Sequence, residues 1–309
     1  MKLAAGYRNA STMKLAAGYR NASTTKLAAE FRSLTRTLWV VSVLALGGCA
    51  QVGYRDAIES LTHFRPLAQS SRVRYAPGAE AFARRVAALL PAATAHVETM
   101  HYRPFRDEPV VYVCGNDACF HRFVDARWNF TAAVVYDNRL LLAPRLFDRE
   151  PQRLVPILLH ELSHLHMGQV RGHYSLGIPV WFHEGLASFV AHGGGADLVS
   201  DEQAWAAAAR QHYFLPDEQH LPWQSRRLAG DWKLPVSVFY RQALLFVRWL
   251  HQRDPQTFRR LLISLQDGAD FDAAFAQAYQ ANPARAARAF FDRGPSEPKT
   301  IHAVKGEQP

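Results

Sequence analysis

Two stretches decide the interpretation of this chain: VPILLHELSHLHMG at residues 155–168 and IPVWFHEGLASFV at residues 178–190. In the first, Pro156 suits a first helical turn and Gly168 suits a C-terminal cap, which predicts one helix over residues 155–167. The stretch is rich in leucine, so this helix is expected to be buried.

The predicted helix carries the pattern HExxH. His160 and His164 are four positions apart, so both imidazoles project from one side of the helix and can bind one metal ion. Glu161 lies beside His160, where its carboxylate can take a proton from a metal-bound water. The opposite side is expected to anchor the helix in the core and carries Val155, Leu158, Leu162 and Leu165.

A third metal ligand is expected from the second stretch. Pro179 suits a helix start and Gly193–Gly195 suits a break, which places Glu184 on a second short helix. Together with His160 and His164 it makes three protein ligands, which leave a position for water. We therefore expect one catalytic Zn²⁺ per chain; a purely structural zinc site is the alternative.

The segments HELSHLHMGQV and WFHEGLASFV resemble the two active-site helices of aminopeptidase-type gluzincins, zinc peptidases with HExxH followed by Glu-Gly-[Phe/Leu]-Ala. The resemblance implies a zincin-like fold, zinc bound by His160, His164 and Glu184, and Glu161 as the general base. Gly185 would let the two helices pack closely. The resemblance is strongest over residues 156–190.

The sequence departs from the fuller gluzincin pattern at two points. His183 stands where the aminopeptidases usually have asparagine, and their Gly-x-Met-Glu-Asn segment is absent. The resemblance therefore implies peptide-bond hydrolysis without specifying an endopeptidase or an exopeptidase. The competing pattern HExxHxxGxxH fails, because Met167 and Val170 occupy its glycine and histidine positions. Other candidates for the third ligand are His166, His173 and His183.

The resemblance also implies a tyrosine that donates to the oxyanion of the intermediate. Tyr240, 56 positions after Glu184, matches that role. The alternative is that Tyr240 is one more aromatic residue of a core-facing helix. Tyr213 and His220 are the remaining candidate donors.

The order of elements predicts an α+β fold, a small N-terminal sheet followed by a mostly helical part. A helix is expected over residues 80–100 and strands over 109–114, 132–136 and 139–143, the last two as a hairpin. From residue 154 onward nearly everything reads as helix. Strand 139–143 is a candidate edge for an extended peptide substrate, and plain core sheet is the alternative.

The charge of the chain is concentrated at its N-terminus. Of 36 basic and 27 acidic residues, seven and one fall in residues 1–48, which leaves 29 against 26. Such a balance is a weak argument for nucleic acid, so no nucleic-acid partner is expected. With 49% hydrophobic residues, the remainder can bury a substantial core.

The N-terminal segment predicts export. MKLAAGYRNAST occupies residues 1–12 and again 13–24, and an apolar stretch too short to span a bilayer then leads to Leu46-Gly47-Gly48-Cys49. This tetrapeptide resembles a bacterial lipobox, which implies lipidation of Cys49. An ordinary signal peptide is the alternative. Ala50 in place of aspartate favours the outer membrane, facing the periplasm.

An exported chain enters an oxidising compartment, so Cys114 and Cys119 are expected to form a disulfide. With His121 they make a weak alternative, a second metal site.

The expected organisation has four parts. A signal segment, 1–48, and a tether, 49–77, precede a peptidase domain at 78–292 whose parts are 78–145 and 146–292, and a flexible tail covers 293–309.

The expected function is hydrolysis of peptides or envelope proteins. The alternative is a non-catalytic envelope scaffold or adaptor lipoprotein that retains the gluzincin fold. The oligomeric state is left open.

Overall fold

The computed structural model describes residues 61–124, 131–136, 139–171, 177–217 and 226–295. All of them belong to one compact unit that spans residues 47–309. The predicted signal segment with Cys49, the candidates His173 and His220, and most of the predicted tail lie outside the described residues. Among the described helices, none combines the length and apolarity needed to cross a membrane.

The sheet is small and mixed. Its strands are β1 (Arg65–Leu67), β2 (Ser70–Tyr75), β3 (Val110–Val113), β4 (Ala133–Tyr136) and β5 (Arg139–Leu142). Their order is β1-β2-β3-β5-β4, with β2, β3 and β5 parallel and the outer strands β1 and β4 antiparallel to their neighbours. Strand β4 is therefore an edge of the sheet.

Both faces of the sheet carry buried side chains. Successive side chains of a strand point to opposite faces, and in β3 both sets are buried. Val111 and Val113 of β3 pack into the main core, whereas Tyr112 between them packs into a smaller cluster with Phe64. The disulfide Cys114–Cys119 lies beside this smaller cluster and joins the end of β3 to α4.

Helices make up most of the described chain. The structure has α3 (Glu80–His101), α4 (Asp117–Phe120), α5 (Arg145–Asp148), α6 (Leu154–Arg171), α7 (Val180–Val190), α8 (Asp201–Ala209), α9 (Val236–Arg253), α10 (Pro255–Gln266), α11 (Phe271–Tyr279) and α12 (Pro283–Arg293). Short 3₁₀ turns lie at Leu61–His63, Pro151–Arg153 and Ala229–Trp232.

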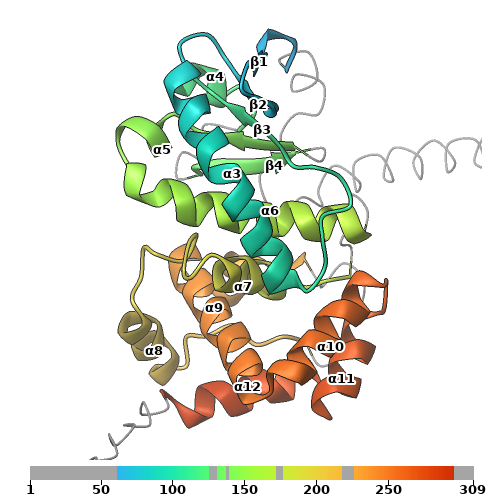
Figure 1. Ribbon diagram of the computed structural model, residues 1–309. Coiled ribbons are helices and arrows are strands. Elements are labelled where there is room, and N and C mark those ends of the chain that lie inside the picture. The colour runs from blue at the N-terminus through green and yellow to red at the C-terminus, as the bar shows by residue number, and fades with distance from the viewer. Residues whose placement is uncertain (1–60, 125–130, 137–138, 172–176, 218–225, 296–309) are drawn as a thin grey trace, which may run out of the picture. The chain divides into compact units, whose positions relative to one another are not determined.

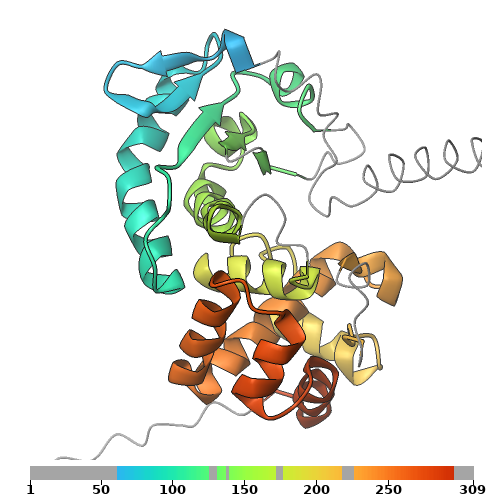
Figure 2. The same cartoon turned by 90° about the vertical axis from the view of Figure 1, so that its right-hand side faces the viewer.

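Helix α6 lies between the two parts of the fold. On one side it packs against α3, β4 and β5, and on the other against α7 and α10. Figures 1 and 2 show the sheet on one side of α6 and the C-terminal helices on the other, with α3 running alongside α6. Its buried leucines therefore join the sheet core to the helical core.

The α+β class and the order of elements are confirmed. The helix expected over 80–100 is α3, and the strands expected around 132–143 pair antiparallel from Ala133–Leu142 to Tyr136–Arg139. The turn expected between them lies outside the described residues.

The tether expected over residues 49–77 is wrong for its later part, because β1 and β2 occupy residues 65–75. The apolar side chains of Leu67 and Val73 are buried at 4% and 0% exposure, and they hold these strands on the main core.

The predicted end of the active-site helix near Gly168 is also wrong, since α6 continues to Arg171. A helical glycine costs only about 1 kcal/mol, which tertiary contacts can offset. Here Arg171 donates from Nη1 to the carbonyl oxygens of Leu265 and Ala269, at 2.8 and 3.0 Å, and fixes the last turn.

Two packing expectations need correction. Val155 is 42% exposed and does not anchor α6, although Leu158, Leu162 and Leu165 are buried. Gly185 brings α7 close to α9 rather than to α6. A Cβ atom at Gly185 would lie 2.6 Å from the carbonyl oxygen of Ala243, which leaves no room for any larger residue.

We predict that Gly185→Ala destabilises the fold by about 1–3 kcal/mol, because α7 and α9 must separate. Gly168→Ala is the matched control, a helical glycine whose Cβ would meet nothing within 4 Å, and it should stabilise α6 by about 1 kcal/mol. Urea denaturation measures both, and equal effects of the two substitutions would contradict the prediction.

Candidate metal centre

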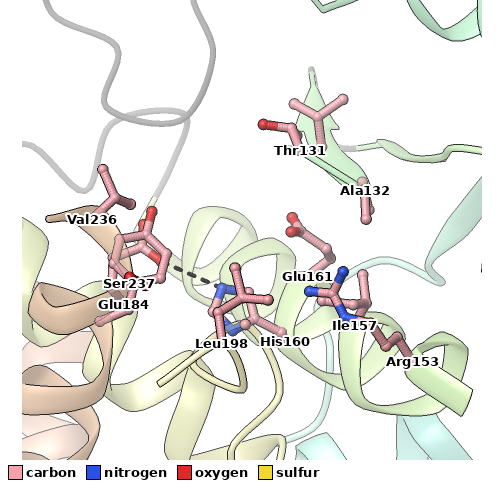
Figure 3. A pocket seen from close by; sticks show the side chains of 14 residues that line it. Thr131, Ala132, Arg153, Ile157, His160, Glu161, Glu184, Leu198, Val236 and Ser237 are labelled. Carbon is pink, nitrogen blue, oxygen red and sulfur yellow. Dashed lines mark ion pairs between the residues drawn. The ribbon is translucent and has the colours of Figure 1, made fainter. Parts of the chain in front are cut away.

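Three side chains from two helices converge on one point. The Nε2 atoms of His160 and His164 on α6 are 3.1 Å apart, and they lie 3.3 and 3.4 Å from Oε2 of Glu184 on α7. Figure 3 marks the contact between His160 and Glu184. His160 and Glu184 are 4% and 1% exposed. This buried group can bind a metal ion.

The electrostatics of the group favour a negative charge at Glu184. Burial alone would raise the pKa of this carboxyl, but His164 and His160 outweigh burial and hold the pKa well below its ordinary value. Burial would likewise lower the pKa of His164, and Glu184 reverses the effect and raises it. The carboxylate of Glu184 therefore faces the two imidazoles with Oε2–Nε2 distances of 3.3 and 3.4 Å, close enough for all three atoms to bind one ion.

Glu161 lies on the pocket side of α6. It lines a pocket of about 330 Å³ together with His160 and Glu184. Burial raises its pKa, and the nearby His160 and His164 only partly oppose that effect. A carboxyl group tuned in this way is better suited to accept and return a proton near neutral pH.

The pocket opens between the sheet and the helices. Figure 3 shows Glu161 facing Thr131 and Ala132. Besides the acidic residues and His160, the pocket is lined by Thr131, Ala132, Ala133, Val134, Arg153, Ile157, Gly195, Leu198, Val236, Ser237 and Tyr240. Tyr240, expected from the sequence as an oxyanion donor, is thus brought to the same pocket as Glu161.

The strand beside the pocket differs from the expected one. Residues 139–143 were the candidate substrate edge, but β5 lies inside the sheet between β3 and β4. The edge is β4, whose Ala133 and Val134 line the pocket. The sequence placed the hairpin correctly but could not reveal which of its strands paired with β3.

The two other candidate ligands within the described residues, His166 and His183, do not join the metal group. His166 and His101 are both fully buried, with ring centroids 4.3 Å apart, and Nε2 of His166 contacts the carbonyl of Arg103 at 2.8 Å. His101 bonds Ser163 through Nε2 at 2.8 Å. These residues form a polar cluster toward α3, away from the pocket lining.

His183 lies near the group, with its ring centroid 6.0 Å from that of His164. Burial lowers its pKa to about 3, so it is neutral at physiological pH. Of the fallback donors, Tyr213 stacks on Phe291 at 4.6 Å and does not line the pocket. The cysteines near His121 are in their disulfide, and no metal-binding group in the described chain contains His121.

The sequence does not predict two contacts of the His160 ring. Its Nδ1 lies 2.9 Å from the carbonyl oxygen of Gly194 and 3.5 Å from Oγ of Ser188. Ser188 could have been found, because it follows Glu184 by one helical turn and shares its face. In the sequence, Gly193–Gly195 predicts only a helix break, because the contact of Gly194 with His160 depends on the tertiary fold.

Comparison with known proteins adds no family. No family model matches the sequence, and no curated protein matches it.

We predict that the purified protein binds one divalent metal ion per chain and that His164→Gln or Glu184→Gln abolishes this binding. Metal content after dialysis measures the effect, and added metal should raise the melting temperature of the wild type but not of these two ligand variants. His166→Gln is the control, a buried histidine of the same helix outside the group, and it should retain the ion. Loss of metal in this control, or retention in the two ligand variants, would contradict the assignment.

Proposed function

We propose that this protein is a zinc-dependent peptidase with the gluzincin arrangement, in which His160, His164 and Glu184 hold the metal. The supporting observation is that the three residues form one group and that two of them, His160 and Glu184, line the same pocket as Glu161. The separations of 3.1–3.4 Å also suit zinc. Ligands about 2.0–2.1 Å from a tetrahedral Zn²⁺ are about 3.3 Å from one another. Two imidazoles with one carboxylate are a zinc ligand set, not a calcium one.

Two residues of the pocket lining, Glu161 and Tyr240, have a role in the proposed hydrolysis. Bound zinc supplies a Lewis acid that lowers the pKa of water and polarises a carbonyl group. Glu161 takes the proton from the attacking water and delivers it to the leaving amine. This double role is favoured by the raised pKa of its carboxyl group. Tyr240 lines the same pocket, and we propose that its phenol donates a hydrogen bond to the oxyanion.

The pocket surroundings suggest how a peptide binds. An extended segment can pair with the main chain of β4, the sheet edge beside Glu161. Leu198 and Val236 line the pocket although they are 66% and 43% exposed. Such exposed apolar residues favour an apolar substrate side chain.

Among the described residues, the arginine that lines the pocket does not favour an acidic substrate. Arg153 contacts Oε2 of Glu150 at 2.6 Å and Oδ2 of Asp197 at 2.8 Å, so its charge is already opposed. We further propose that the enzyme acts in the bacterial cell envelope, lipid-anchored through Cys49, on the basis of the N-terminal sequence alone.

The decisive test compares the wild type with Glu161→Gln over residues 50–309. We predict that both bind one zinc ion, since Glu161 is no ligand, but that only the wild type cleaves a peptide library, with apolar residues enriched beside the cut. Zinc content and mass spectrometry of the products measure both properties. Cleavage by the variant would contradict the mechanism, and zinc binding without cleavage in either protein would favour the scaffold.

For Tyr240 we predict that Tyr240→Phe lowers kcat roughly 10²- to 10³-fold, because one oxyanion donor is lost, while KM and zinc content stay near the wild-type values. Steady-state kinetics on a peptide found in the library measure the change. Tyr213→Phe, outside the pocket lining, is the matched control. An unchanged kcat in Tyr240→Phe would assign Tyr240 to packing alone.

A further inference from the structure

The segment that follows α7 lies directly on His160. The carbonyl oxygen of Gly194 is 2.9 Å from Nδ1 of His160. A carbonyl oxygen can only accept, so Nδ1 carries the proton and donates it. In a neutral ring the lone pair is then on Nε2, the atom that faces His164 and Glu184. The contact with Gly194 thus fixes both the tautomer and the direction of the ligand.

This contact requires glycine at two adjacent positions. A Cβ atom at Gly195 would lie 2.4 Å from Nδ1 of His160, which is a steric overlap with the ring itself. A Cβ atom at Gly194 would lie 2.5 Å from the carbonyl oxygen of Pro156, in the first turn of α6. A side chain at Gly195 would therefore push the segment away from the ring of His160, and a side chain at Gly194 would push it away from α6.

The glycine segment is held on both sides by contacts that do not involve the metal group. Before it, the amide of Gly193 donates to the carbonyl oxygen of Ser188 at 2.8 Å. After it, Arg241 donates to the carbonyl oxygen of Ala196 at 3.2 Å. Arg153 donates to both carboxylate oxygens of Asp197, at 2.8 and 3.2 Å. The carbonyl of Gly194 is therefore preorganised for His160.

We propose that Gly194 and Gly195 are positioning residues of the metal centre. The backbone carbonyl of Gly194 orients His160, a task that carboxylate or carbonyl groups commonly perform for metal-binding histidines. Gly195 supplies the missing side-chain volume that lets the carbonyl approach. The proposal rests on metal binding by His160, His164 and Glu184, but not on catalysis.

Gly193 provides a matched control for Gly195. Both have positive φ values, +102° and +81°, so alanine strains the backbone at either position. A Cβ atom at Gly193, however, would meet only Nη1 of Arg241, at 3.5 Å, and would leave His160 untouched. The two alanine variants thus share the strain and differ in the contact with the ligand.

The experiment measures zinc affinity of the full chain by competition with a chromophoric chelator, and the visible spectrum of the cobalt-substituted protein. Gly195→Ala should bind zinc roughly 10- to 100-fold more weakly and change the cobalt spectrum. Gly193→Ala should stay close to the wild type in both. Equal affinities of the two variants would overturn the proposal. A wild type that binds no zinc would overturn the proposed function as well.

A second measurement needs no variant and covers the case in which Gly195→Ala does not fold. Nitrogen-15 spectra of the zinc-loaded wild type report which ring nitrogen of His160 carries the proton. A protonated Nδ1 with a metal-bound Nε2 supports the proposal, and zinc bound through Nδ1 overturns it.

Discussion

A buried carboxylate constrains the centre of this molecule. Glu184 is 1% exposed, and taking such a charge out of water costs several kcal/mol unless positive charge opposes it. Two imidazoles meet it, with Nε2 atoms 3.3 and 3.4 Å from its Oε2. A neutral imidazole carries no net charge, so the two rings compensate the carboxylate fully only by taking up a proton. A divalent cation between the three groups would satisfy all of them at once.

The backbone is arranged to hold that carboxylate in place. Helix α7 carries Glu184, and the next residue, Gly185, brings α7 into contact with the backbone of α9 at Ala243. Helix α6 carries both histidines and is fixed by the leucines that join its two cores. Tyr240, on α9, enters the same pocket. Residues of α6, α7 and α9 thus line one pocket. The close packing of α7 against α9 is possible because residue 185 is glycine.

The sequence predicted the elements better than their partners. HExxH on a leucine-rich helix and the periodic pattern of α3 are local signals, and both helices formed, although α6 continues past its expected end to Arg171. The strands at residues 65–75 were missed because polar and arginine residues separate their buried positions, Leu67 and Val73. Whether β4 or β5 is the edge, and that Gly194 contacts His160, depends on residues distant in sequence. No local pattern encodes such contacts.

The position of β4 has a consequence for solubility. A sheet edge offers unpaired main-chain groups to any extended chain, including another copy of the same protein, and edges are a common origin of aggregation. Proteins usually cover or charge such an edge, but cover here would also close the pocket beside Glu161. Strand β4 has only four residues, Ala133–Tyr136. So short a strand limits how many hydrogen bonds an unwanted neighbour can gain.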